Sequence, residues 1–167
     1  MRVLGIDPGL RELGWAVLES SKKKNNKSKK YKLISYGLIT TSDKKDISQR
    51  LFQIGQEIKM ILRKFKPDVC AMESVFVWKD PSAALKLGMV LGTCFEISNS
   101  RKIKVRVLSP LFVKSKISGD RYADKNKLGK FVQKKIILNG KTNGFIKELP
   151  HHITDAMAIA ISSFYCK

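Results

Sequence analysis

Length and charge limit what this chain can be. It has 167 residues, and its 33 Lys and Arg against 14 Asp and Glu give a formal net charge of +19 at pH 7. A chain of this length fits one domain, which buries roughly two thirds of its unfolded surface without disulfides or a structural metal. Because solubility alone needs a net charge of only about 2 to 8, the excess predicts a polyanionic partner, with nucleic acid as the first choice over a merely soluble surface.

The sequence has no sign of a membrane span or a disulfide framework. No apolar run approaches the roughly 18 residues that a span needs, and no secretory signal precedes the strand-like start at Arg2 and Val3. We therefore expect a cytoplasmic protein without a membrane partner. Cys70, Cys94 and Cys166 lack C-x-x-C spacing, which predicts reduced, mostly buried thiols.

The first third of the chain is typical of an antiparallel meander. An apolar run at residues 2–6 ends in a turn signal at residues 7–9, and residues 14–18 resume the run, which predicts a hairpin. Residues 33–41 supply a third strand. Before them lies a basic hairpin insertion at about residues 21–32, with seven lysines, which we interpret as a solvated loop or as an arm that contacts DNA.

Helices and short strands alternate through the rest of the chain. Asp46, Asp80 and Asp124 have the character of helix N-caps, and Pro67 stops the first helix. We expect helices over about residues 46–65, 80–98, 110–116, 124–136 and 153–164, and strands over residues 69–72 and 104–108.

Three acidic residues stand at the ends of apolar elements in this lysine-rich chain. Asp7 follows the first strand, Glu73 follows the fourth, and Asp155 is expected in the first turn of the last helix. Carboxylates gathered in one cleft repel one another, and divalent cations relieve that repulsion, with Mg²⁺ or Mn²⁺ favoured by oxygen ligands. Two such ions about 4 Å apart support phosphodiester hydrolysis by water, and no Ser or Cys motif suggests a covalent intermediate. Taken singly, each acid has an equally good structural explanation.

Four motifs along the chain point to one known family. They are GIDPGLRELGWAV, AMESVF, ALKLGMVLG and TDAMAIA. Their order and spacing resemble those of the RuvC family of Holliday-junction resolvases over nearly the whole chain. The resemblance implies a single domain over residues 1–167 with a ribonuclease-H-like α/β fold, in which helices flank a five-stranded mixed sheet. It also implies a homodimer that cuts four-way DNA junctions symmetrically in recombination and repair, with two Mg²⁺ ions per site that Mn²⁺ can replace, and a branch-migration motor as a possible further partner.

The resemblance places four metal-site positions in this chain. They fall on Asp7, Glu73, His152 and Asp155, and many family members carry Asp where this chain has His152. A neutral imidazole can ligate Mn²⁺ and, less readily, Mg²⁺, or it can position or deprotonate the attacking water, so both roles for His152 stay open. The resemblance assigns nothing to the neighbouring His151.

Further family positions predict contacts to DNA. Phe76 falls where the family places an aromatic beside the junction centre, able to stack on an unpaired base. Lys114 and Lys125 match two family lysines near the scissile phosphate, where a cation holds the strand or stabilises developing charge. Arg121 and Tyr122 are expected to contact the DNA backbone. A core aromatic and ordinary surface lysines are the structural alternatives.

The chain departs from the family at the basic insertion and at Leu91, where many relatives have arginine. Family dimers pack through the helix that here begins at Asp80, so Ala84, Leu87, Gly88 and Leu91 serve either an interface or the core.

Two other functions are open on the sequence alone. A ribonuclease-H-fold phosphotransferase needs a second glycine-rich phosphate loop, which we do not find, and a nucleic-acid-binding protein without junction-specific cleavage would lose no activity on metal removal.

Overall fold

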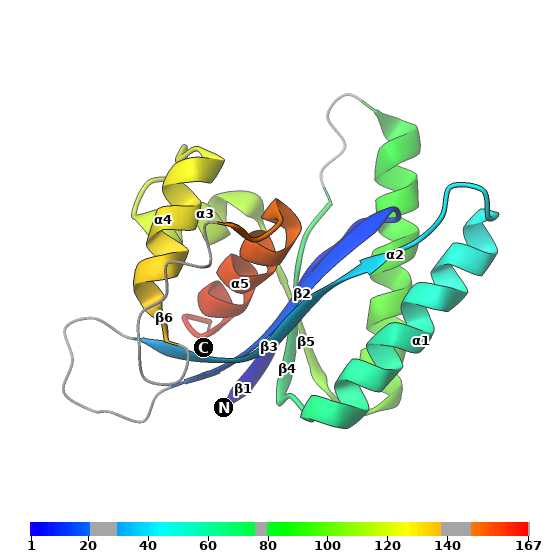
Figure 1. Cartoon of the computed structure of the whole chain (residues 1–167), viewed down its shortest axis with the longest axis horizontal. Helices are drawn as coiled ribbons and strands as arrows, with labels where there is room; N and C mark the ends of the chain where they lie inside the picture. Colours follow the sequence, from blue (N-terminus) through cyan, green and yellow to red (C-terminus); the bar gives the residue numbers. More distant parts are fainter. Residues whose placement is uncertain (21–29, 76–79, 138–147, 167) are drawn as a thin grey trace.

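A mixed β-sheet covered by helices on both faces forms the frame of the protein (Figure 1). The computed structural model describes residues 1–20, 30–75, 80–137 and 148–166. The strands of these residues are β1 (Arg2–Asp7), β2 (Glu12–Ser20), β3 (Tyr31–Thr40), β4 (Val69–Glu73), β5 (Lys104–Leu108) and β6 (Ile136–Ile137). The helices are α1 (Ile47–Phe65), α2 (Pro81–Ser100), α3 (Pro110–Ser118), α4 (Lys125–Lys135) and α5 (His151–Ser163).

The sheet has six strands in the order β5-β4-β1-β2-β3-β6. β1–β2 and β2–β3 pair antiparallel, which confirms the predicted meander, and the other neighbours pair parallel. The expected count of five strands was wrong, because Ile136 belongs to the two-residue strand β6 and not to the preceding helix. Ile136 pairs with Tyr31 and Ile137 with Lys32 at the free edge of β3, so a distant partner overrides the local helical pattern.

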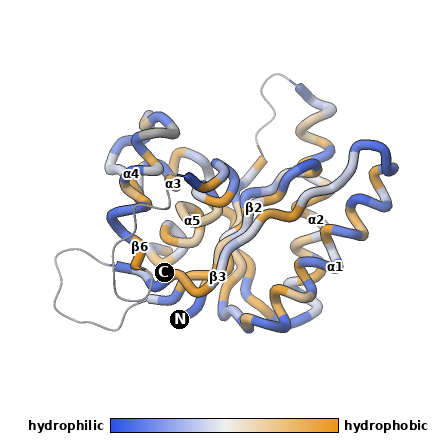
Figure 2. The backbone as a smooth tube through the Cα atoms, viewed as in Figure 1, coloured by the Kyte–Doolittle hydropathy of each residue, from blue (hydrophilic) through white to orange (hydrophobic). Residues whose placement is uncertain are grey.

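Two apolar cores lie on opposite faces of the sheet. Along β1, Val3 packs on the side of α3, α4 and α5, whereas Leu4 and Ile6 pack on the side of α1 and α2. Figures 1 and 2 show this division, with α5 running along the sheet as a mostly hydrophobic helix. Gly5 allows the close approach of α5, because a Cβ at this position would lie 2.1 Å from the carbonyl oxygen of Ala156.

The predicted N-caps are confirmed. The side chains of Asp46, Asp80 and Asp124 accept hydrogen bonds from backbone N–H groups three residues later, at 2.9, 3.0 and 2.7 Å. Cys70 and Cys94 are buried thiols, and Cys166 is half-buried, as the spacing predicted. No helix in the described ranges is long and apolar enough to cross a membrane.

The start of α5 differs from the prediction and matters for the site. The helix begins at His151, two residues before the expected Ile153, because the carbonyl of Pro150 accepts the N–H of Ile153 at 3.0 Å. His152 therefore lies in the first helical turn, and Asp155 lies in the second turn instead of the first. The two histidines are polar, so the apolar periodicity that marks the helix only starts after them.

Helix α2 is buried over its second half only. Its buried residues are Val90, Leu91, Cys94, Ile97 and Ser98. Of the residues predicted for the stripe in the first half, Ala84 and Leu87 are half-buried, whereas Gly88 is exposed, and a Cβ there would meet nothing within 4 Å. Leu85 and Met89 on the same face are 63% and 38% exposed. The first half of α2 is thus an uncovered apolar face.

Candidate functional site

Two carboxylates lie side by side at one edge of the sheet. β1 and β4 are parallel neighbours with Ile6 opposite Met72, so the next residues, Asp7 and Glu73, end the two strands together. Neighbouring strands lie about 4.8 Å apart, and equivalent positions point to the same face. That face carries α5, because Val3 and Ala71, at alternate positions of the two strands, belong to the α5 core.

Helix α5 adds two more side chains to this edge. His152 and Asp155 are three residues apart, so they share one face of the helix. The helix start rests directly on β2 at Gly14, where a Cβ would lie 2.0 Å from the carbonyl oxygen and 2.3 Å from the carbonyl carbon of His152. Only a glycine permits this approach, which fixes the height of His152 above the strand ends.

These side chains line one hollow of about 300 Å³. Asp7, Glu73, His152 and Asp155 lie around it together with Lys114, which α3 supplies. The rest of the wall consists of Pro110, Val113, Leu128, Ala158 and Ile159. Four of the predicted site positions and one predicted lysine are therefore brought together from four separate elements. The apolar wall strengthens the mutual repulsion of the carboxylates and their demand for cations.

His152 lies between two acids. Its Nδ1 is 2.6 Å from Oδ2 of Asp7, and its Nε2 is 3.9 Å from Oε2 of Glu12. A ring that carries its proton on Nδ1 would donate this hydrogen bond to the Asp7 carboxylate. The side chain of Asp7 is 14% exposed, while those of His152 and Glu12 are 41% and 43% exposed. Asp7 is thus the most desolvated of the three side chains.

The donor set suits hard divalent cations that are shared with substrate. Three carboxylates and one imidazole are oxygen and nitrogen donors, and the hollow contains no thiolate. Among the residues that the structure describes, no three such side chains converge closely enough to hold one ion by themselves. A divalent ion here would therefore need water or substrate oxygens among its ligands.

The loop from α3 to α4 carries two of the predicted DNA contacts. Arg121 and Tyr122 are both exposed, and Tyr122 is 86% exposed. Asp120 shapes this loop: it accepts the backbone N–H of Tyr122 at 2.9 Å and contacts Nζ of Lys127 at 3.1 Å. These two contacts, the Tyr122 N–H first, hold the pKa of the Asp120 carboxyl below its usual value.

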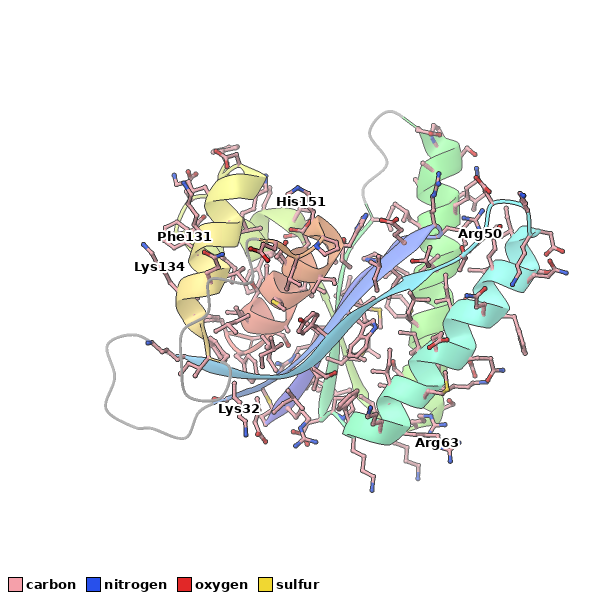
Figure 3. The ribbon with its side chains drawn as sticks, in the orientation of Figure 1. Lys32, Arg50, Arg63, Phe131, Lys134 and His151 are labelled. Atoms are coloured by element: carbon pink, nitrogen blue, oxygen red, sulfur yellow. The ribbon has the colours of Figure 1, made fainter. Side chains whose placement is uncertain are left out.

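Other predicted positions lie partly or wholly outside the residues that the structure describes. Lys125 is the first residue of α4, but its side chain is not described, and Phe76 lies outside the described residues, as does most of the basic insertion. His151 is exposed at the start of α5, where Figure 3 shows it on the outer surface. The sequence prediction missed Glu12. The alternation of side chains along β2 could have indicated it, because Glu12 and Gly14 point to the same face of the strand, toward α5.

Comparisons with known proteins match nearly the whole chain to one family of nucleases. The family model described as crossover junction endodeoxyribonuclease RuvC matches residues 3–163. A relative of that name from Ehrlichia canis (strain Jake) is 34% identical over 167 residues, covering 100% of this chain and 98% of the relative. The Thermus thermophilus RuvC structure matches with a TM-score of 0.84 at 27% identity, over 99% of this chain and 95% of that one. A T. thermophilus RuvC in complex with Holliday junction substrate matches with a TM-score of 0.82 at 25% identity, over 99% and 94%. These structural matches confirm the expected ribonuclease-H-like α/β fold.

Proposed function

The chain belongs to the RuvC family of crossover junction endodeoxyribonucleases, and we propose that Asp7, Glu73 and Asp155 are the metal-binding carboxylates of its active site. The protein is a metal-dependent nuclease that resolves Holliday junctions by hydrolysing DNA phosphodiester bonds. One observation carries the residue assignment: three carboxylates, an imidazole and the amino group of Lys114 line a single hollow. A purely structural role for these acids gives no reason for their convergence.

We propose Mg²⁺ as the natural ion, with Mn²⁺ as a substitute and two ions per site. When bound, the ions activate a water and stabilise the oxygens that attack and leave phosphorus. Asp7 and Glu73 end neighbouring strands and would hold ions at the sheet edge, while Asp155 would hold them from the helix. Each ion then needs only one or two of these side chains, and water and substrate phosphate complete its coordination.

His152 and Lys114 would act on the reacting groups in different ways. His152 is placed to ligate an ion through the nitrogen that faces Asp7, or to orient the attacking water. Lys114 would hold the scissile phosphate while negative charge develops on its oxygens. Hydrolysis adds the water oxygen to phosphorus and breaks one phosphodiester P–O bond, so no covalent enzyme intermediate is required.

The DNA would reach this hollow over a basic surface. Arg121 and Tyr122 are exposed in the loop between α3 and α4, and Lys125 is the first residue of α4. We propose that they contact the backbone of the cut strand, and that Phe76 stacks on a base near the junction centre, as the sequence predicted. The net charge of +19 supports such contacts, because each phosphate neutralised releases counterions.

We further propose that the protein is a symmetric homodimer formed through the first half of α2. Leu85, Gly88, Met89 and Gly92 lie at helical spacing on one exposed face, and the two glycines allow close helix approach. A two-fold pairing of this face would match the near two-fold symmetry of a four-way junction. Leu91 points away from this face into the core, where it is 7% exposed, so it serves the core and not this face.

A cytoplasmic location stays a prediction from the sequence, and a branch-migration motor as partner stays a prediction from the family resemblance. A junction resolvase acts where chromosomal DNA is recombined, which supports the expected location. A motor would bring junctions to the enzyme.

Cleavage of a synthetic four-way junction tests the proposed site. The purified protein should nick opposed strands symmetrically with Mg²⁺ or Mn²⁺, leave linear duplex intact and stop when EDTA is added. Asp7→Asn keeps the size of the side chain but removes a charged ligand, and we expect cleavage to fall by about 100-fold or more while junction binding persists. Asp46→Asn, at the cap of α1 on the other face of the sheet, is the matched control. Unchanged cleavage by Asp7→Asn would refute the site.

A further inference from the structure

Glu12 is an acid near the proposed site to which neither the family resemblance nor the sequence pattern gives a role. It begins β2, and its Oε2 lies 3.9 Å from Nε2 of His152, on the opposite side of the ring from Asp7. From this geometry we infer that Glu12 is a positioning residue, which holds the imidazole of His152 so that its Nδ1 faces the metal-binding hollow. The inference rests on the proposed role of His152 as a metal ligand.

The ring chemistry of histidine requires such a partner. A nitrogen that ligates a metal must give up its proton, so a neutral His152 that binds through Nδ1 keeps its remaining proton on Nε2. Metal-ligating histidines almost always donate this second N–H to a carboxylate or carbonyl, which fixes the orientation of the ring and raises its basicity. Within the described residues, Glu12 is the carboxylate that faces Nε2.

The backbone holds Glu12 and His152 in this relation. Gly14 and Glu12 point to the same face of β2, and Gly14 contacts the carbonyl of His152 directly. At the other end of the short segment, the N–H of Thr41 donates to the carbonyl of Arg11 at 2.9 Å, which ties the residue before Glu12 to the end of β3. The backbone that carries the Glu12 carboxylate is therefore held in place next to His152.

The gap of 3.9 Å is longer than a direct hydrogen bond, which ends near 3.2 Å. The side chains of Glu12 and His152 are both about two fifths exposed, so small torsional changes on the open side of the hollow are not blocked by packing. In the structure, Nδ1 lies 2.6 Å from Oδ2 of Asp7. A metal ion held at Nδ1 would leave the one ring proton on Nε2, and Glu12 would be the carboxylate positioned to accept it.

The test measures Mn²⁺ binding to the DNA-free protein by electron paramagnetic resonance of the unbound ion. Glu12→Met removes the acceptor with little change in size, and we expect Mn²⁺ affinity to fall about 10-fold or more. Glu12→Gln keeps a neutral hydrogen-bond acceptor, so its Mn²⁺ affinity should lie between that of Glu12→Met and that of the wild-type protein. Glu19→Met, on the same strand at its far end, is the matched control and should bind Mn²⁺ like wild type.

A second background separates positioning from general damage. His152→Asp has no ring nitrogen, so adding Glu12→Met to it should cost no further Mn²⁺ affinity. An equal loss in both backgrounds, or no loss in the wild-type background, would overturn the inference. If Glu12→Met is silent while Asp7→Asn and His152→Ala abolish Mn²⁺ binding, the inference fails and the proposed site stands. If those two variants also bind Mn²⁺ normally, the proposed site itself fails.

Discussion

Substitution of Gly14 by alanine should disable cleavage without touching an acid. The added Cβ would lie 2.0 Å from the carbonyl oxygen of His152, and contacts below 3.0 Å are essentially never seen. The start of α5 must therefore move by about 1 Å, and it carries His152 and Asp155 with it. A displacement of about 1 Å at reacting groups can cost about 100-fold in rate. Overpacking should also cost about 1–3 kcal/mol of unfolding free energy.

Single-turnover cleavage and thermal unfolding together measure this effect. We expect Gly14→Ala to cut a four-way junction about 100-fold more slowly at saturating Mg²⁺. Its Tm should fall by only about 2–4 °C for each kcal/mol lost, which leaves the protein folded at 25 °C. Gly129→Ala in α4 is the control, because its Cβ would meet nothing within 4 Å, and it should cut like wild type.

The predicted loss of cleavage requires the start of α5 to move as a unit. If Gly14→Ala lowers Tm as expected but cuts at the wild-type rate, the height of α5 above the strand ends is not critical for catalysis. If both Tm and rate are unchanged, the contact between β2 and His152 is looser than the structure places it. Either result would refute the argument.

Three further predictions concern other parts of the protein. Lys114→Met should slow cleavage about 100-fold with little change in junction affinity, because one cation at the transition state is lost, whereas Lys116→Met, whose amino group lies over the Phe112 ring, should cut normally in the same assay. Met89→Asp places a charge on the open face of α2 and should convert a dimer to a monomer in sedimentation velocity, and a dimer that survives would contradict this interface. Burial raises the pKa of the Cys70 thiol to about 12, so at pH 8 Ellman's reagent should leave it unreacted in the native protein and modify it only in denaturant; fast native reaction would mean that this core opens.

The sequence predicted the elements well where local signals were strong. Asp46 and Asp80 begin their helices where the cap pattern placed them, because a capping side chain acts within three residues of the chain. β6 was missed for the opposite reason. Two isoleucines carry no periodicity, and only their pairing with Tyr31 and Lys32, a hundred residues earlier, makes them a strand.

The site was predictable only in part. Apolar runs that end in Asp7 and Glu73 mark these acids locally, but their adjacency depends on the parallel register of β1 and β4, which no local pattern encodes. His152 lies 145 residues from Asp7, and its role came from family resemblance. Glu12 looks like an ordinary surface acid until α5 is seen resting on Gly14.

Basic and acidic side chains have different roles in DNA binding and DNA cleavage. Long-range attraction for DNA comes from the basic surface, since 33 cationic side chains outnumber the acids. The hollow is the local exception, because Asp7, Glu73 and Asp155 repel the phosphate that must enter it. Cations reverse that repulsion, so the strand is held productively only when the metal is present. If these acids form the proposed metal site, we expect junction binding without metal and cleavage only once the site is occupied.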